Sequence, residues 1–433
     1  MKSHKGAFMK SRTVRNLFFG LALPGMLISS LQGCGSATDS TVSSAKATES
    51  TEKIGLLFAS HGDIDDFDKD LEDYIKISFQ KNVGIPLPMW SRKIIDEPAY
   101  RLSVKTVRGQ YDKIGPTRYY ANSLKQADAI NEEFKTILPN AKAYVGFNFA
   151  HPYIEETLDV MRKDGVTKIV VMNKGAQFSY ASSGENMEDV LKYFKKHPDY
   201  DAEALGVAYY GFEDRFIKVM AKSIDEDIQK NFPGVPRNEV CLFLGSHGLP
   251  QWLINKGDSA ITQMKRSVVA LRKEMTEYKV YHGFLNDDFF PGAKWVSPTS
   301  ADVAPQLVED GCKNVAMDGR LSFTTHHRAT LYDMNYVARN IFKDESAKLI
   351  SQGKLSAPIR SELLPNFDGN KDHARFIAEI TKETLEGKGL NIALKRKGQP
   401  ALEPESIGKP GLVLKGATHL DDSVPEWSPY PAK

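Results

Sequence analysis

The chain has 433 residues, of which 41% are hydrophobic and 26% are charged, and it is long enough for two or three domains. This composition excludes collagen-like, coiled-coil and wholly disordered chains. The formal charge is +2, but residues 1–33 hold five basic residues and no acidic one, so the remainder has 52 basic against 55 acidic residues. Such a nearly neutral body does not favour binding to nucleic acid.

The amino terminus has the order of a secretory signal peptide. Its basic region precedes an apolar run at residues 17–28, which is too short and interrupted to span a bilayer as a mature helix. The run closes on Leu31-Gln32-Gly33-Cys34, which resembles the bacterial lipobox, whose cysteine is lipidated and becomes the first mature residue. We therefore expect a lipoprotein signal peptide at 1–33, lipidation of Cys34 and a Ser/Thr-rich tether at 34–52.

These features predict an exported protein, anchored by lipid to a bacterial membrane and facing the periplasm. Gly35 and Ser36 follow Cys34 without the Asp that often retains lipoproteins at the inner membrane, which favours the outer membrane. The alternative is an ordinary cleavage site with a cysteine beside it by chance.

Beyond the tether, short apolar runs alternate with longer amphipathic segments. The runs predicted as strands are residues 54–59, 143–147, 168–172, 240–245, 278–284 and 314–317. The segments predicted as helices are residues 123–138, 152–163, 215–231, 259–274 and 301–309. This alternation predicts the doubly wound α/β class, in which helices flank parallel sheets.

An internal repeat indicates two duplicated α/β halves. An apolar strand ends in Ser60-His61-Gly62, and a second one ends in Ser246-His247-Gly248. In the same order, Gly165 and Gly311 each follow a helical segment and precede a new strand, as a glycine C-cap does.

The spacing of the repeat locates an insertion in the first half. His61 and Gly165 are 104 residues apart, whereas His247 and Gly311 are 64 apart. The excess is assigned to a Pro- and aromatic-rich loop at 84–118, expected to form a binding lip. The predicted domains are therefore 53–210 with this lip, 211–396, and an extended Pro-rich tail at 397–433 that either packs on the surface or stays mobile.

The two histidines are the candidate functional residues. Ligands of open α/β sheets bind beyond the carboxyl ends of the strands, and a Gly after a His allows close approach of the backbone. His61 and His247 are therefore expected to face one cleft, with Asp63 beside His61. Cys241 and Cys312 lie among apolar residues and are either two buried thiols or one disulfide.

Residues 244–250, Leu-Gly-Ser-His-Gly-Leu-Pro, resemble a motif of the class II tetrapyrrole chelatases and most closely of the ferrochelatases, whose His is catalytic and contacts the metal. Further similarity follows in the family's order at residues 152–156, 177–184 and 323–332. The resemblance covers residues 53–345. It implies two Rossmann-like doubly wound halves with parallel sheets, related by pseudo-two-fold symmetry, and assigns catalysis to His247.

Two departures from that family bear on the site. The family's Glu opposite the catalytic His is replaced by Ala329. The first family motif, Asn-Leu-Gly-Thr/Ser-Pro, is here Ser60-His61-Gly62-Asp63, which is similar to the cobalt and sirohydrochlorin chelatases and their metal-binding His. We therefore expect His61 to share the catalytic and metal-binding roles of His247, and His326 or His327 to be the next candidate metal ligand, with at most one of that pair facing the cleft.

The resemblance also implies a set of tetrapyrrole contacts. They are Arg118, Tyr119, Gln177, Ser179, Leu249 and Pro250. Arg118 is suited to a bidentate contact with a propionate, although a solvated Arg at a helix start is an equal alternative.

The function implied is insertion of Fe²⁺ into a porphyrin, a lyase reaction in which the tetrapyrrole and Fe²⁺ (or Co²⁺) are substrates and no cofactor is permanently bound. Three alternatives stay open: a cobalt chelatase acting on a sirohydrochlorin-type ring, a non-catalytic haem- or metal-binding lipoprotein, and a periplasmic binding protein for another ligand. Hydride transfer and serine hydrolysis are disfavoured, because the chain lacks a Gly-x-Gly-x-x-Gly loop after the first strand and the Gly-x-Ser-x-Gly spacing at His247. The oligomeric state is not predicted.

Overall fold

The computed structural model describes residues 52–81, 89–286, 294–404, 407 and 423–431. The expected signal peptide, the lipidation site Cys34 and nearly all of the expected tether lie outside these residues. Within the described part of the chain, no helix is both long enough and apolar enough to cross a membrane.

The first sheet has five strands in the order β2-β1-β3-β4-β9. These strands are β1 (Ile54–Ser60), β2 (Ala141–Phe147), β3 (Lys168–Asn173), β4 (Glu203–Val207) and β9 (Asn391–Lys395). The first four are parallel, and β9 pairs antiparallel with β4. Every residue of β1 after Ile54 is buried, as expected for a central strand covered on both faces.

The second sheet has four parallel strands in the order β6-β5-β7-β8. They are β5 (Val240–His247), β6 (Lys279–Leu285), β7 (Asn314–Asp318) and β8 (Arg360–Leu363). The arrangement β6-β5-β7 repeats β2-β1-β3, with the first strand of each half flanked by the second and third. The duplicated α/β halves and the parallel sheets predicted from the sequence are therefore confirmed.

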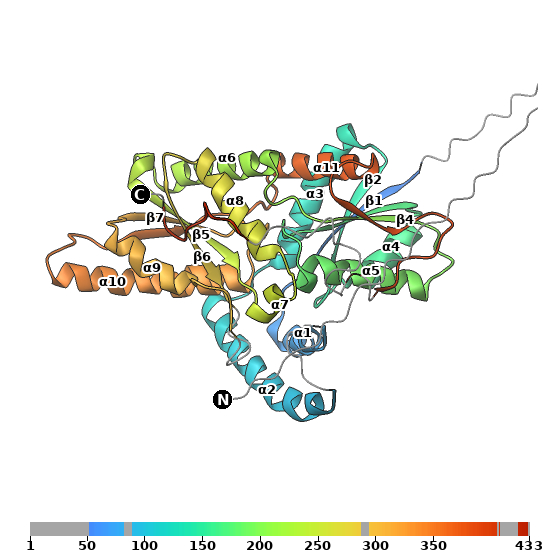
Figure 1. Ribbon diagram of the computed structural model, residues 1–433, viewed down its shortest axis with the longest axis horizontal. Coiled ribbons are helices and arrows are strands. Elements are labelled where there is room, and N and C mark those ends of the chain that lie inside the picture. Colours follow the sequence, from blue (N-terminus) through green and yellow to red (C-terminus); the bar gives the residue numbers. More distant parts are fainter. Residues whose placement is uncertain (1–51, 82–88, 287–293, 405–406, 408–422, 432–433) are drawn as a thin grey trace, which may run out of the picture. The chain divides into compact units, whose positions relative to one another are not determined.

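Helices flank both sheets (Figure 1). They are α1 (Phe67–Lys81), α2 (Met89–Ile114), α3 (Tyr119–Ile137), α4 (Ile154–Lys163), α5 (Glu185–Lys196), α6 (Asp214–Asn231), α7 (Gln251–Asn255), α8 (Ala260–Glu274), α9 (Ser300–Glu309), α10 (Arg339–Ser351) and α11 (Lys371–Leu385). Two π-helices, η1 (Tyr180–Gly184) and η3 (Thr330–Ala338), and the 3-10 turn η2 (Arg237–Glu239) complete the elements. Figure 1 shows α6 and α11 on one side of the sheets and α1 and α2 on the other.

The second sequence echo also corresponds to equivalent structure. Helix α4 is followed by Gly165 and strand β3, and helix α9 is followed by Gly311 and strand β7. Both glycines have a φ of 77°, in the left-handed region that glycine adopts without a steric penalty. The predicted glycine C-caps are confirmed.

The loop expected at 84–118 was wrong for the described residues of this range, 89–118, which are mostly helical, whereas 84–88 lie outside the described residues and the role of a binding lip stays a prediction. Helix α2 occupies Met89–Ile114 and continues through Pro98, a residue that ordinarily ends or kinks a helix. The reason lies in its carboxyl-terminal part, where Ser103, Val107 and Tyr111 are buried at a spacing of four residues. Val107 and Tyr111 belong to a small apolar cluster with residues of α1, which stabilises the helix.

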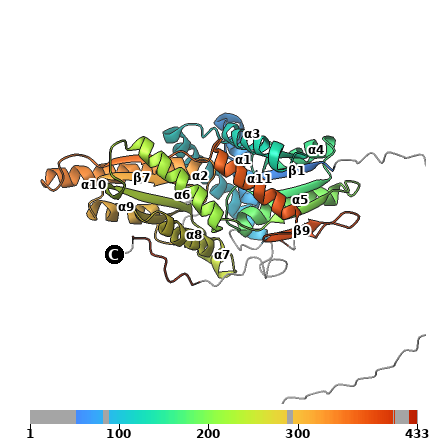
Figure 2. The ribbon, with the colours of Figure 1, turned by 90° about the horizontal axis from the view of Figure 1, so that it is seen from above.

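The two halves are also less sequential than expected. Residues 391–395, assigned to the second half in the predicted range 211–396, form β9 and complete the first sheet. Ile392 and Leu394 alternate into the buried cluster of that sheet, which explains the pairing. Helix α11 packs against both α3 and α6, so it contacts both halves (Figure 2).

Part of the 397–433 tail packs on the body of the protein. The Leu402 amide donates to the Leu394 carbonyl, and Trp427 contacts Phe284 of β6. The remaining residues of the tail, 405–406, 408–422 and 432–433, lie outside the described part of the chain.

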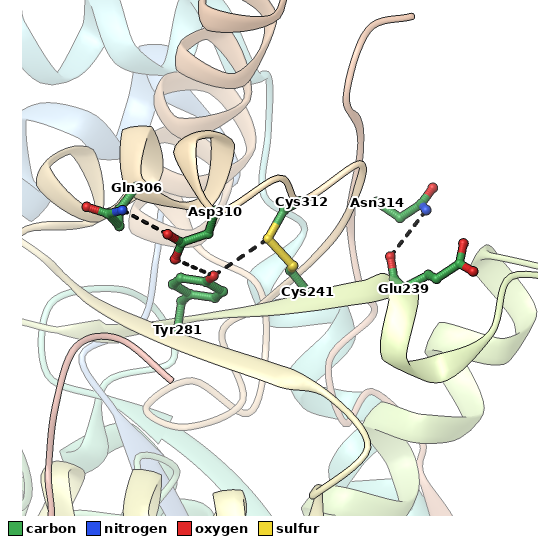
Figure 3. Close-up of a disulfide and its surroundings, with 7 residues drawn as sticks. All are labelled: Glu239, Cys241, Tyr281, Gln306, Asp310, Cys312 and Asn314. Carbon is green, nitrogen blue, oxygen red and sulfur yellow. Dashed lines mark hydrogen bonds between the residues drawn. A yellow bond between two sulfur atoms is a disulfide. The ribbon is translucent and has the colours of Figure 1, made fainter. Parts of the chain in front are cut away.

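Cys241 and Cys312 form a disulfide, which resolves the alternatives left open by the sequence (Figure 3). It joins β5 to the residue pair that precedes β7, two neighbouring strands of the second sheet. Both cysteines are 4% exposed, and the Tyr281 hydroxyl lies 3.8 Å from the sulfur of Cys312.

Candidate functional site

His247 is the last residue of the central strand of the second sheet. Its Nδ1–H donates to the carbonyl of Gly248, which leaves the lone pair of the imidazole on Nε2. A Cβ at Gly248 would lie 1.7 Å from Oδ1 of Asn286, so any larger residue here would displace that side chain. The side chain of His247 is partly exposed, so the strand end presents an imidazole that is oriented by its own backbone.

His61 directly follows the equivalent strand of the first sheet. Its ring stacks on Phe149 with centroids 4.6 Å apart, and its Nε2–H donates to the carbonyl of Ala181 at 2.6 Å. The same nitrogen lies 3.9 Å from Oε2 of Glu185. The side chain of Glu185 is only 12% exposed, so a partly buried carboxylate accompanies this imidazole.

Glu185 was missed by the sequence analysis. It is the first residue of α5 and follows the π-helix η1, where an acidic residue is ordinary because it complements the helix dipole. A carboxylate at a helix start therefore carries no sequence signal for a site. Its proximity to His61 depends on the loop that brings η1 beside β1.

Asp63 joins the end of β1 to the second half. Its carboxylate accepts from the amide of Ile64 at 2.8 Å, from the amide of Arg328 at 2.9 Å and from the hydroxyl of Tyr111. Burial raises the pKa of Asp63, and these donors oppose the increase. The guanidinium of Arg328 in turn donates to Gln110 of α2 at 2.7 Å. Asp63 is thus a buried carboxylate that binds a second-half loop, and its contact with a ligand stays a prediction.

His326 and His327 have different surroundings. Burial lowers the pKa of His326 to about 4, which favours the neutral ring, and its Nδ1 lies 3.3 Å from Oγ1 of Thr330 and from Nδ2 of Asn366. Nδ1 of His327 accepts from the amide of Ala329 at 2.9 Å. The ring of Phe323 lies 6.0 Å from that of His247 and 4.0 Å from that of His327, so His327 is the member of the pair on the side of His247.

Ala329, which stands where the family has Glu, is part of the core. It is 2% exposed and belongs to a buried apolar cluster with Leu285, Met334 and Phe342. A carboxylate at this position would need to enter apolar surroundings.

The described residues contain no group of three or more His, Cys, Asp or Glu side chains arranged to hold a metal ion. The four histidines predicted as metal ligands are therefore not gathered into one centre. Two separate partly exposed arrangements exist instead, the His61–Glu185 pair and His247 with its neighbour Phe323.

The residues predicted to contact the tetrapyrrole differ in their solvent exposure. Arg118 is exposed and precedes α3 with a φ of 54°. Tyr119 is buried and donates to the hydroxyl of Ser60 at 3.0 Å. Leu249 is buried and Pro250 is partly exposed, both directly after the Ser246-His247-Gly248 strand end.

Gln177 and Ser179 use their side chains to join the two halves. Gln177 Nε2 donates to the carbonyl of Leu321 at 2.7 Å, and the hydroxyl of Ser179 donates to Asp258 at 2.7 Å. Burial raises the pKa of Asp258 to about 6. Contact of Gln177 and Ser179 with a ligand remains a prediction.

Lys174, a second residue missed by the sequence analysis, is buried between the halves. Its ammonium donates to Ser123 of α3 and, at 3.1 Å, to Thr325 of the second half. The ammonium also lies 4.4 Å from the centre of the Tyr119 ring. Burial lowers the pKa of Lys174 to about 7. A single Lys directly after a strand gives no sequence signal for such burial.

The sequence of this chain is similar to those of known ferrochelatases. A family model described as Ferrochelatase matches residues 53–356. The mitochondrial ferrochelatase of Drosophila melanogaster is 25% identical over 287 residues, covering 65% of this chain and 68% of that protein. The ferrochelatase of Nostoc sp. is 23% identical over 297 residues, covering 67% of this chain and 75% of that protein.

Among solved structures, SirB from Bacillus subtilis with Fe³⁺ aligns over 78% of this chain and 98% of its own. The two are 15% identical, and the TM-score is 0.42.

Proposed function

This chain belongs to the ferrochelatase family, and from that premise we propose that it inserts Fe²⁺ into a porphyrin to form haem. The reaction replaces two pyrrole N–H protons by the ion, so it needs a proton acceptor at the face of the ring where the protons leave. The observation that carries the proposal is His247, a partly exposed imidazole at the end of a central strand, inside the motif shared with the family.

His247 is assigned as that proton acceptor. Its Nδ1–H is bound to the carbonyl of Gly248, so the accepting lone pair is on Nε2. Imidazole titrates near neutral pH and therefore both accepts and releases a proton under ordinary conditions. Fixing one nitrogen by a backbone carbonyl orients the other without cost at the moment of reaction.

The His61–Glu185 pair is assigned to the metal ion before insertion. Nε2 of His61 carries the proton donated to Ala181, so the ring would bind the ion through Nδ1, with Glu185 as the neighbouring oxygen ligand. Mixed nitrogen and oxygen ligands suit Fe²⁺, and a pair of ligands binds loosely enough to release the ion. Ala329 supplies no carboxylate. We therefore assign the acidic role to Glu185, a partly buried acid beside the strand-end histidine His61.

The test is insertion of Fe²⁺ into protoporphyrin by the full-length chain under anaerobic conditions, followed by the porphyrin absorption spectrum. We expect His247→Ala to lower the rate at least 100-fold, the range lost with a general base. His151→Ala is the matched control, because His151 is an exposed histidine paired with Glu156. Full activity of His247→Ala would contradict the assignment of His247, and spectral binding without conversion would show a carrier of the same family.

A second candidate, cobalt insertion into a sirohydrochlorin-type ring, is favoured by the histidine of Ser60-His61-Gly62. The same assay with Co²⁺ and with that ring distinguishes the two, since the better metal and ring pair is the one with the higher kcat/KM. Loss of cobalt turnover in His61→Ala, with ferrous turnover kept, would support the cobalt reaction.

We also propose that the protein is exported and anchored by lipid at Cys34, on the outer membrane facing the periplasm. The lipobox-like Leu31-Gln32-Gly33-Cys34 supports this location, and the Cys241–Cys312 disulfide is typical of oxidising compartments. Mass spectrometry of the mature amino terminus checks it, and an unmodified Cys34 would contradict it.

A further inference from the structure

The carboxyl-terminal segment 423–431 contacts the edge strand of the second sheet. The amide of His282 in β6 donates to the carbonyl of Pro429 at 2.8 Å. The indole N–H of Trp427 donates to Nδ1 of the same histidine at 3.3 Å. The segment, red near the label C in Figure 1, therefore makes two hydrogen bonds to one residue of β6. Trp427 lies beyond the residues matched by the family model, which end at 356.

His282 connects this segment with the strand that ends at His247. It is fully buried, and its Nε2 lies 2.7 Å from the hydroxyl of Ser246, which is also fully buried. Strands β5 and β6 are paired in register here, with Leu244 opposite His282. Ser246 immediately precedes His247, so a continuous set of hydrogen bonds runs from Trp427 to the neighbour of the proposed proton acceptor.

The donors and acceptors in this set have only one consistent assignment. An indole nitrogen only donates, so Nδ1 of His282 must accept. Burial, with the charges of Arg272 and Lys265 nearby, lowers the pKa of His282 to about 3, so the ring is neutral. The single ring proton is then on Nε2 and is donated to the hydroxyl oxygen of Ser246. Trp427 thereby fixes the tautomer of His282 and the role of Ser246.

We propose that Trp427 is a positioning residue for the reaction at His247, acting through His282 and Ser246 on the end of β5. This inference rests on the function proposed above, and it assigns a role in the site to a segment outside the family match. Without the indole N–H, Nδ1 of His282 has no donor from Trp427, and the ring is able to adopt the other tautomer. Ser246 then changes from acceptor to donor, and the backbone that carries His247 relaxes.

The experiment is a double-mutant cycle on the full-length chain with Trp427→Phe and Ser246→Ala. Phenylalanine keeps an aromatic ring beside Phe284, whose ring centre lies 6.1 Å from that of Trp427, and removes the N–H donor together with part of the indole volume. We expect each single variant to lower kcat for metal insertion about 10-fold with KM nearly unchanged. The double variant is expected to lose no more than either single one, because both break one set of hydrogen bonds. Independent, multiplicative losses would overturn the proposal.

The matched control is Lys265→Met, which removes the ammonium 4.5 Å from the Trp427 ring and keeps the indole N–H. Its kcat is expected within twofold of the wild type, whereas an equal loss would indicate that packing of the segment alone matters. Nitrogen-15 NMR of the histidine rings gives a readout that does not need turnover. His282 is expected to show a proton on Nε2 in the wild type and a changed tautomer in Trp427→Phe.

The NMR readout separates the two proposals. If the wild-type chain inserts no metal but the tautomer of His282 still depends on Trp427, the proposed function fails and the coupling from Trp427 to His282 stands. If turnover is present and neither the tautomer nor kcat responds to Trp427→Phe, the positioning role is overturned.

Discussion

The two strand-end histidines differ in the nitrogen that is bound to the backbone. His247 donates from Nδ1 to the carbonyl of Gly248, whereas His61 donates from Nε2 to the carbonyl of Ala181. The repeated Ser-His-Gly identified both residues from the sequence, because a motif at the end of a strand is a local pattern. The orientation of each ring could not be predicted, since it depends on carbonyl groups one residue away in one case and 120 residues away in the other. The same limit applies to Glu185.

A pH-dependent stability is expected from Lys174. In the unfolded chain its pKa is about 10.4, whereas burial lowers the folded value to about 7. Below pH 7 both states hold the proton and the full cost of burying the charge is present. Between pH 7 and 10 only the unfolded state holds it, so stability from this group rises with pH. Lys174→Met removes this cost, about 4.6 kcal/mol at pH 6, but also loses the hydrogen bonds to Ser123 and Thr325, about 1 kcal/mol each. The net gain in the free energy of unfolding is therefore expected to be roughly 2 kcal/mol at pH 6 and progressively less towards pH 10.

Urea unfolding at pH 6, 8 and 10 measures this effect. Lys163→Met is the control, because Lys163 is exposed on α4 and its replacement is expected to have a small effect without this pH dependence. A gain from Lys174→Met that stays constant from pH 6 to pH 10 would show that the ammonium is not the cause.

At the scale of elements, the sequence predicted β1, β2, β3, β5, β6 and β7, and it missed β4, β8 and β9. The strands β1, β3, β5 and β7 are recognisable from the sequence because both of their faces are covered, so that their residues are almost all apolar. β9 was missed because only two of its residues, Ile392 and Leu394, enter the core of a distant sheet. The helix at 89–114 was missed because its prolines and aromatic residues suggested a loop. Its buried residues Val107 and Tyr111 pack against α1, and this contact cannot be recognised from the sequence of α2 alone.

The contact between β6 and α9 predicts a position that tolerates no side chain. A Cβ on Gly283 would lie 2.7 Å from Cα of Ser300 and 2.9 Å from its backbone nitrogen, neither of which is a flexible side-chain atom. We expect Gly283→Ala to lower the free energy of unfolding by about 3 kcal/mol, since α9 must move away from the strand.

Gly109→Ala in α2 is the opposite case and serves as the control. No atom lies within 4 Å of a Cβ there, and alanine is favoured over glycine in a helix by about 1 kcal/mol. Thermal melts of both variants should therefore shift in opposite directions. A Gly283→Ala protein as stable as the wild type would mean that β6 and α9 are less closely packed than described.

At the scale of the whole described unit, buried polar side chains hold the two halves together. Lys174 with Thr325, Gln177 with Leu321, and Asp63 with Arg328 each cross from the first half to the second. The repeat predicted two halves of one fold, and the order of their strands came only from the structure. The repeat could not predict these cross-contacts, because they join residues more than 140 positions apart whose partners have no repeated counterpart.

The disulfide contributes to the stability of the second half. It closes a chain segment with a sequence separation of 71 between Cys241 and Cys312. The Cys241→Ala/Cys312→Ala double variant is expected to lose about 2–4 kcal/mol of unfolding free energy. Dithiothreitol should lower the unfolding free energy of the wild type and leave that of the variant unchanged. Equal denaturation midpoints with and without reductant in the wild type would show that the bond adds nothing.

The return of the chain to its first sheet has a consequence for biosynthesis. β9 and α11 come from residues 371–395, yet β9 pairs with β4 and α11 packs on α3. While the chain is still being made, β4 has an open edge, and a first half released early exposes it to other chains. Native assembly of the amino-terminal sheet must therefore wait until almost the whole polypeptide has left the ribosome. Under the export proposed above, this late closure would keep the nascent polypeptide unfolded until it is translocated.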